Sequence, residues 1–263
     1  MRRAIICLLV VSMLAGCNSP FGVMLGLGHT PTKPPVTIDI LCDFDGGGTC
    51  TADNLREALD RVLPPLAERP GSLLRLWAMG NELADTTLLA SATVPASSRR
   101  QNTQRVAWAR FVTTTRSLFL GAYAASADTR RRYRSPIAEA ITRVAWADSR
   151  AADRYCLVLT DAREYSDVGG DLECGALPAA TTFTRQLQRH HVLAPQSLRG
   201  MSVAFCFVTI GTIDGRRCDS TLERADKVRE LWITTLRAAG ATRVFYSTAI
   251  PHLDGLEVSH DTD

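Results

Sequence analysis

The stretch from Thr37 to Thr49, with the sequence TIDILCDFDGGGT, constrains the fold of this chain more than any other. It opens with β-branched and apolar residues such as Ile38 and Ile40, which are typical of a buried strand. Two carboxylates, Asp43 and Asp45, follow at the end of this strand, and three glycines then lead toward a predicted helix. Ligands of open α/β sheets lie outside the carboxyl ends of strands. The stretch therefore predicts either a cation site or an acid/base pair.

Apolar runs and helical spacings alternate along the rest of the chain. We expect helices from about residue 52 and at 103–125 (one or two), 137–146, 183–190 and 222–239, and strands at 72–79, 86–94, 155–159, 201–210 and 243–246. The strand at 86–94 is predicted to pair antiparallel with the one before it. Pro64 and Pro65 should end or kink the first helix. This alternation predicts an α/β fold with a mainly parallel, doubly wound, Rossmann-like sheet and helices on both faces.

The first 16 residues are typical of an export signal. Arg2 and Arg3 precede an apolar run from Ile5 to Leu14 that is too short to span a bilayer as a helix. The run ends in Leu-Ala-Gly-Cys, which resembles the lipobox of bacterial lipoproteins and implies that Cys17 carries a lipid. An ordinary secretory signal is the alternative. Asn18 follows, where many Gram-negative inner-membrane lipoproteins have Asp, so we expect a lipid anchor in the cell envelope, at the outer membrane.

The rest of the chain divides into a tether and a single domain. Residues 17–35 are rich in Gly, Pro, Ser and Thr, which predicts a flexible tether behind the lipidated cysteine. Residues 36–258 have the length of one domain with a sizeable core. Removing the signal lowers the formal net charge from +3 to +1, which argues against a nucleic-acid partner.

Six cysteines follow Cys17, and export to an oxidising compartment predicts disulfides among them. Three of them fall within apolar strands, namely Cys42, Cys156 and Cys206. The disulfide candidates are those in loops after strands, namely Cys50, Cys174 and Cys218. The pairing itself cannot be deduced from the sequence. A zinc site is not indicated, because the chain has no C-x₂-C spacing.

Three motifs, in this order, resemble those of the von Willebrand factor A-type domain. The first family motif, a strand followed by Asp-x-Ser-x-Ser, is similar to the segment from Asp45 to Thr49, in which Gly47 replaces the first serine. The second, Thr-Pro-Leu-x-x-Ala-Leu, is similar to the segment that begins at Ser135. The third, a strand ending in Thr-Asp-Gly, is similar to Thr160-Asp161-Ala162. The resemblance covers most of the body, from about residue 36 to residue 248.

The resemblance implies a metal-ion-dependent adhesion site, at which Mg²⁺ captures an acidic residue of a protein partner. The ligands that it implies are Asp45, Thr49, Ser135 and Asp161. Two carboxylates and two hydroxyls are oxygen ligands of the kind that Mg²⁺ prefers. Gly47 supplies no hydroxyl, so a degenerate site is the alternative, and several family members without the metal bind partners by other surfaces. Simple capping of helices and loops by the same side chains also remains open.

The function implied by this resemblance is a binding module without catalysis of its own. Its partner would be another envelope protein or a protein on a neighbouring cell. A second resemblance points to an enzyme, because Asp43-Phe44-Asp45-Gly46 followed by Thr49 is similar to the Asp-x-Asp-Gly-Thr motif of haloacid-dehalogenase phosphatases. It implies Asp43 as nucleophile and Asp45 as general acid/base, with Mg²⁺ between them. Two extra glycines before Thr49 depart from that motif, so the phosphatase is kept as the alternative.

Overall fold

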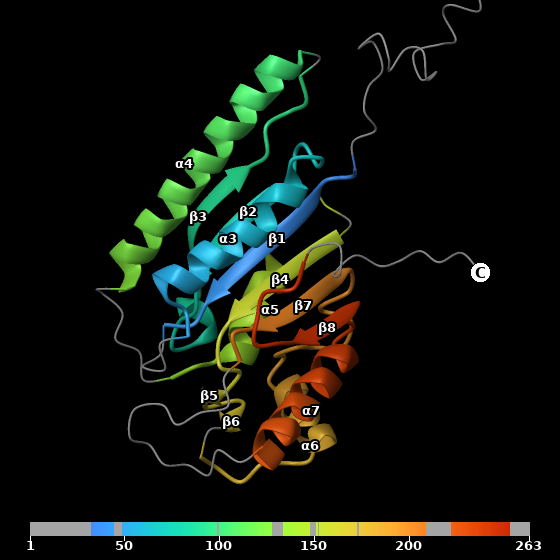
Figure 1. The fold of residues 1–263 in the computed structure, drawn as a ribbon. Helices are drawn as coiled ribbons and strands as arrows, with labels where there is room; N and C mark the ends of the chain where they lie inside the picture. Colours follow the sequence, from blue (N-terminus) through green and yellow to red (C-terminus); the bar gives the residue numbers. More distant parts are fainter. Residues whose placement is uncertain are drawn as a thin grey trace, which may run out of the picture.

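The computed structural model describes residues 33–44, 49–98, 100–127, 134–147, 151, 153–172, 174–208 and 222–252. The predicted signal, Cys17, Asp45 and Cys218 lie outside these ranges. The described part is an α/β fold in which helices flank one six-stranded sheet (Figure 1). The predicted fold class is therefore confirmed.

The elements follow the order that the sequence predicts. The strands of the large sheet are β1 (Val36–Cys42), β2 (Leu73–Ala78), β3 (Thr87–Thr93), β4 (Asp153–Leu159), β7 (Met201–Cys206) and β8 (Arg243–Tyr246). The helices are α3 (Ala52–Leu66), α4 (Gln101–Ala127), α5 (Ile137–Trp146), α6 (Ala180–Arg189) and α7 (Leu222–Ala238). Three short elements were not predicted, because they are too brief to show a hydrophobic period: η1 (Leu83–Asp85), β5 (Tyr165–Ser166) and β6 (Gly170–Asp171). Helix α3 ends directly after Pro64 and Pro65, as expected.

The sheet has the strand order β3-β2-β1-β4-β7-β8. All neighbouring strands are parallel except β3, which pairs antiparallel with β2 as predicted. The chain first builds the sheet outward from β1 to β3 and then restarts at β4 on the other side of β1. The direction of winding therefore reverses between β1 and β4, and such a switch point is where open α/β sheets bind ligands.

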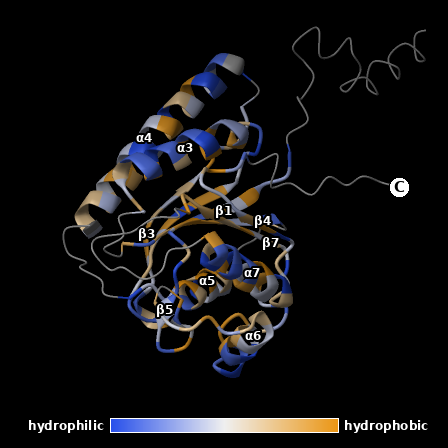
Figure 2. Cartoon of the chain, turned by 60° about the horizontal axis from the view of Figure 1, so that its bottom comes forward, coloured by the Kyte–Doolittle hydropathy of each residue, from blue (hydrophilic) through white to orange (hydrophobic). Residues whose placement is uncertain are grey.

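Each face of the sheet has its own apolar core. Alternate residues of β1 point to opposite faces, so Ile38 and Ile40 pack with α3 and α4, whereas Leu41 packs with α5, α6 and α7. Figure 2 shows these two helical layers on either side of strands that are mostly hydrophobic. All seven residues of β1 are buried, which explains why this strand is apolar on both faces.

The exception in β1 is a buried carboxylate, Asp39, which is fully enclosed by partners from both neighbouring strands. Arg75 of β2 donates to both of its oxygens, from Nε to Oδ1 at 2.6 Å and from Nη2 to Oδ2 at 2.9 Å. Trp77 Nε1 donates to Oδ1 at 2.8 Å. Arg154 of β4 donates to Oδ2 at 3.4 Å and to two main-chain carbonyls in the last turn of α5. This network therefore links β1 to β2, β4 and α5 and fixes how these elements are aligned.

We predict that Asp39→Ala lowers the free energy of unfolding by about 3–5 kcal/mol, because it leaves Arg75 buried without its carboxylate partner. Urea denaturation followed by circular dichroism measures this loss. Glu68→Ala is the control, since Glu68 forms only an exposed ion pair with Lys33. A loss as small as that of the control would show that the buried network contributes nothing to stability.

Candidate functional site

The candidate site lies at the carboxyl ends of β1 and β4, at the switch point of the sheet. Asp43 directly follows β1, and its N–H donates to the carbonyl of Leu159, the last residue of β4, at 3.2 Å. Thr160 and Asp161 directly follow β4. Asp43 and Asp161 are both buried, with 1% and 5% of their surface exposed. The structure thus brings two strand-end carboxylates to the same edge of the sheet.

The carboxylate of Asp43 is the meeting point of two hydroxyls from distant parts of the chain. Thr160 Oγ1 donates to Asp43 Oδ2 at 2.8 Å, and Ser135 Oγ donates to Asp43 Oδ1 at 3.3 Å. All three side chains are buried. A hydroxyl that donates its proton to a carboxylate still has oxygen lone pairs to offer to a cation or to a further donor.

Two main-chain hydrogen bonds hold Ser135 in place. Its N–H donates to the carbonyl of Tyr165 at 3.1 Å, and the N–H of Tyr165 donates back to the carbonyl of Ser135 at 3.0 Å. The residue in the N-cap position of α5 is Pro136, which makes no side-chain capping bond.

The loop after β4 has the conformation of a glycine turn without a glycine. Ala162 has a φ of 65°, in the left-handed region that favours glycine. Its N–H donates to Thr160 Oγ1 at 3.2 Å, and its carbonyl accepts from Trp232 Nε1 at 2.8 Å. These contacts hold the backbone in a conformation that an alanine seldom adopts.

Asp161 also supports its own loop. Its Oδ1 accepts from the N–H of Arg163 at 3.0 Å, which is the loop-capping role left open by the sequence. The guanidinium of Arg163 lies 3.5 Å from Oδ2. Burial raises the pKa of Tyr246 on β8, and the negative charge of Asp161 raises it further. The carboxylate of Asp161 therefore lies beside the guanidinium of Arg163 and close to the neutral phenol of Tyr246.

Two more carboxyl groups lie at the start of α5. Glu139 is in its first turn, and Glu164 comes from the loop after β4. Glu164 is fully buried; its Oε2 accepts from the N–H of Ala138 at 3.0 Å, and its Oε1 accepts from Ser166 Oγ at 2.5 Å. Burial raises the pKa of Glu164 to about 8 and also raises that of Glu139 on α5. Glu164 thus caps α5 through Oε2, and its burial favours the protonated form. No sequence signal separated Glu164 from an ordinary loop glutamate.

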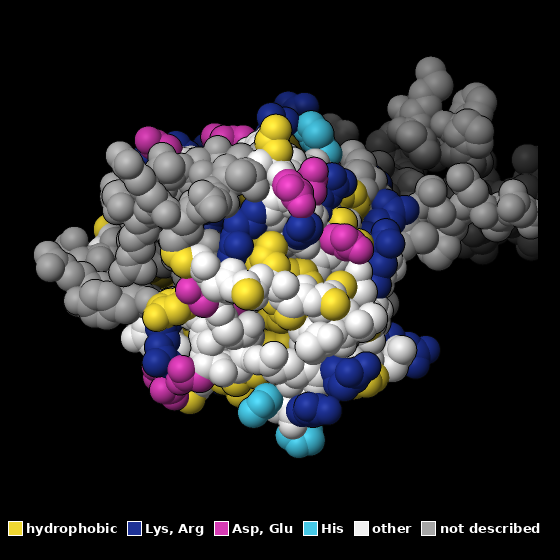
Figure 3. Space-filling model, turned by 90° about the horizontal axis from the view of Figure 1, so that it is seen from below, with side chains coloured by type: hydrophobic (Ala, Val, Ile, Leu, Met, Phe, Trp, Pro, Cys, Tyr) yellow, Lys and Arg dark blue, Asp and Glu magenta, His cyan; other side chains and the backbone are white. Residues whose placement is uncertain are grey.

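The underside of the molecule, seen in Figure 3, presents hydrophobic side chains between charged ones of both signs. One hollow of about 600 Å³ lies between the start of α6 and the first turns of α7, with Leu177 and Leu231 beside Arg224 and Glu230. Since acidic and basic groups both line it, this hollow does not favour one class of ligand.

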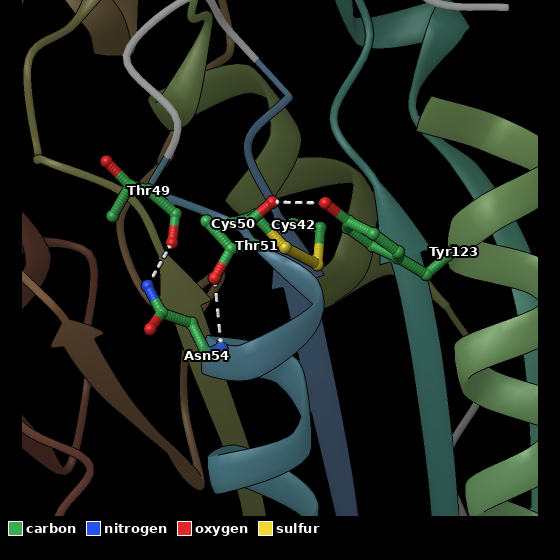
Figure 4. Close-up of a disulfide and its surroundings, with 6 residues drawn as sticks. All are labelled: Cys42, Thr49, Cys50, Thr51, Asn54 and Tyr123. Carbon is green, nitrogen blue, oxygen red and sulfur yellow. Dashed lines mark hydrogen bonds between the residues drawn. A yellow bond between two sulfur atoms is a disulfide. The ribbon is translucent and has the colours of Figure 1, made fainter. Parts of the chain in front are cut away.

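The segment that leads into α3 is fixed by a disulfide and a helix cap (Figure 4). Cys50 is bonded to Cys42, the last residue of β1. The N–H of Asn54 donates to Thr51 Oγ1 at 3.0 Å, and Asn54 Nδ2 donates to the carbonyl of Thr49 at 2.6 Å. Thr49 is thereby held at the same edge of the sheet, but the hydrogen bonds described for it run to α3 and not to Asp43.

The disulfide prediction was right about Cys50 and wrong about the role of Cys42. We assigned Cys42 to the apolar interior of a strand, but its position at the strand's end lets the following loop bring Cys50 back to it. Cys174, another of the candidates, is also disulfide-bonded. Cys218 lies outside the described residues. Cys156 and Cys206 are buried free thiols, as their strand positions indicated, and burial raises the pKa of Cys206 to about 12.

Of the four predicted metal ligands, Ser135 and Asp161 lie at the switch point and Thr49 lies at the same edge, whereas Asp45 is outside the described residues. The carboxylate that meets Ser135 is Asp43, which the metal-site prediction did not include. Within the described ranges, no group of three or more His, Cys, Asp or Glu side chains is arranged to hold a metal. The side chains that meet at Asp43 do not count as such a group, because two of the three are the hydroxyls of Ser135 and Thr160.

Comparisons with known proteins do not assign a family. The chain matches no family profile, and no curated protein is detectably similar to it. No helix in the described ranges is long and apolar enough to span a membrane.

We predict that stability falls as the pH rises between about 5 and 8. The folded pKa of Glu164, about 8, lies above its ordinary value of 4.5, so the folded chain keeps a proton that the unfolded chain releases. This contribution is complete below the unfolded pKa and is lost as the pH passes the folded one. Glu139 acts in the same direction. The measurement is the free energy of unfolding in urea at pH 5, 6.5 and 8.

Glu164→Gln should flatten this dependence, because an amide can still accept from Ala138 but does not titrate. The matched control is Glu223→Gln, since Glu223 is an exposed residue of α7 that pairs with Lys227. If the slope of Glu164→Gln equalled that of the wild type, Glu164 would not be the titrating group.

Proposed function

We propose that this chain is a lipid-anchored binding module of the bacterial cell envelope, with a von Willebrand A-like domain that captures a protein partner. The capture site is the sheet edge that carries Asp43, Ser135, Thr160 and Asp161. The observation that supports this most directly is the convergence of the Ser135 and Thr160 hydroxyls on the Asp43 carboxylate. It occurs at the switch point of the sheet, where ligand sites of such folds lie.

The three motif segments support the proposal because they are far apart in the sequence but lie close together in space. Segments that end β1, precede α5 and follow β4 contribute to one set of contacts. The structure also suggests a revised alignment of the first motif, in which Asp43, rather than Asp45, takes the place of the family's aspartate. Asp45 and Gly47 then stand at the two serine positions of that motif. In this alignment a carboxylate replaces the first hydroxyl.

The residues at this edge fit a Mg²⁺ ion. Asp43 and Asp161 supply carboxylates, and the Ser135 hydroxyl, whose proton points to Asp43, has lone pairs to offer. Asp45 and Thr49 of the glycine loop would complete the set. When bound, Mg²⁺ supplies a positive charge to which an acidic residue of a partner can bind. Arg163 competes with the metal for Asp161, so binding of modest affinity is expected.

We predict that millimolar Mg²⁺ raises the melting temperature relative to EDTA. A ligand that binds only the folded state stabilises it by mass action, by about 2.7 kcal/mol at a concentration one hundred times the Kd. Ser135→Ala and Asp161→Ala should remove this gain, and Asp43→Asn should reduce it. Differential scanning fluorimetry with and without metal provides the measurement.

Asp167→Ala is the control for these variants, because Asp167 is an exposed carboxylate that pairs with Arg134 near the same end of the sheet. Equal melting temperatures in Mg²⁺ and EDTA for the wild type would point to a degenerate metal site. The edge would then have to bind its partner by shape and charge alone.

The phosphatase alternative uses the same edge and is tested directly. A nucleophilic carboxylate needs an oxygen that can reach the phosphorus of a phosphate ester, a far larger ligand than a metal ion, whereas Asp43 has 1% of its surface exposed and accepts a hydroxyl at each oxygen. This observation favours the binding module. An assay with p-nitrophenyl phosphate and Mg²⁺ should show no turnover above background. Turnover that Asp43→Asn abolishes would overturn the binding proposal in favour of the phosphatase.

The proposed anchor gives a further prediction. Cys17→Ser should release the protein from the membrane fraction into the soluble fraction, since the lipid is attached to that sulfur. Phase partitioning in a cloud-point detergent distinguishes the two forms. Cys7→Ser is the matched control, because Cys7 lies inside the predicted signal. A Cys17→Ser protein that still partitions into detergent would contradict the lipid anchor.

A further inference from the structure

A second surface lies at the far edge of the sheet, between β3 and α4. Figure 1 shows α4 running beside β3, with β2 and β1 between this edge and β4. A groove of about 880 Å³ opens there. Ser91 and Thr93 of β3 line one side, and Val106, Arg110 and Leu118 of α4 line the other. The groove is separate from the Asp43 edge, and its role does not depend on the function proposed above.

Some main-chain N–H and C=O groups of β3 point away from β2, toward the groove. At Val94, directly after β3, the N–H donates to the carbonyl of Ser72 at 2.8 Å, and the carbonyl accepts from the N–H of Gly71 at 3.0 Å. Both main-chain groups of Val94 therefore face β2. Because these groups alternate in direction along an antiparallel strand, those of Thr93 and Ser91 point away from β2. As β3 has a strand neighbour only on the β2 side within the described sheet, this edge is a template for another strand.

The α4 side of the groove is a stripe of residues at helical spacing that is apolar at its two ends. Val106, Arg110, Thr114 and Leu118 follow one another at intervals of four residues. Val106 is 69% exposed and Leu118 is 45% exposed, which are large values for apolar side chains. A strand added to β3 would therefore have an apolar surface to cover.

The charge of α4 indicates the chemistry of the partner. The helix contains three arginines, Arg105, Arg110 and Arg116, and no acidic residue. Arg116 pairs with Asp60 of α3, whereas Arg110 lines the groove. A second copy of this chain on the same surface would bring like charges together, whereas an acidic segment would complement them.

We propose that the groove between β3 and α4 binds an extended, acidic segment of another protein. This segment adds a strand to the free edge of β3, as in other cases of β-strand addition. An acidic side chain of the segment pairs with Arg110, and its apolar side chains cover Val106 and Leu118.

The test uses the purified full chain and a fluorescent ten-residue peptide in which every second position, on the face toward α4, is valine or glutamate in turn, and the positions between them are threonine. Fluorescence anisotropy should show saturable binding. Two matched peptides should bind at least about tenfold more weakly, a loss of about 1.4 kcal/mol. One carries N-methyl groups on alternate amides, which blocks strand pairing, and the other has lysine in place of glutamate. Equal binding of the N-methylated peptide, or no binding of the first peptide at millimolar concentration, would overturn the proposal.

Variants of the chain locate the binding. Arg110→Glu should weaken binding of the valine–glutamate peptide at least about tenfold, whereas Arg105→Glu, on the same helix outside the groove lining, should not. Thr93→Pro removes an outward N–H and should also weaken it. Should Thr93→Pro fail to fold, Val106→Asp takes its place. Equal effects of Arg110→Glu and Arg105→Glu would show that the attraction is only a general one of charge and would overturn the assignment. Self-association in sedimentation that Arg110→Glu strengthens would identify a second copy as the occupant and overturn it too.

Discussion

Two carboxylates on one face of a buried strand constrain the whole of this structure. Asp39 and Asp43 are four residues apart in β1 and its extension, so both point to the same side of the sheet, and both are buried. A buried carboxylate without partners is very costly, so neighbouring elements must bring donors to it. Arg75 comes from β2, Arg154 from β4, and two hydroxyls come from the ends of β4 and the approach to α5. The two buried carboxylates of β1 thus require hydrogen-bond donors on the elements that pack against this strand.

The two carboxylates differ in the charge of the partners described for them. Asp39 lies between guanidinium groups in the middle of the sheet, so its charge is compensated and its role is structural. Asp43 lies at the sheet edge and accepts from Ser135 and Thr160, which are neutral hydroxyls with lone pairs to spare. The same residue type, four positions further along, therefore offers a site where a cation or a donor from another molecule can bind.

Much of the fold could be predicted from the sequence, because β1, β4 and β7 are long apolar runs and α5 and α7 show helical spacing. The segments that meet at the switch point were also predictable, since each has a recognisable motif. The contacts of Asp43 with Ser135 and Thr160 were not, because a pattern of apolar residues does not fix a strand's end to the residue. Glu164 and the bond from Cys42 to Cys50 depend on where a loop returns in space, and no local pattern encodes that. The groove beside β3 follows from the packing of α4, which the sequence does not show.

The bond between Cys42 and Cys50 has a consequence for when the site becomes complete. It spans eight positions of sequence and encloses Asp43, the three glycines and Thr49. A chain with both thiols reduced must close this glycine-rich segment against its full conformational entropy, whereas an oxidised chain has already lost much of that freedom. The entropic cost of folding is thereby coupled to the redox state of Cys42 and Cys50. The export proposed above would therefore place the formation of this bond, and with it the completion of the site, in an oxidising compartment.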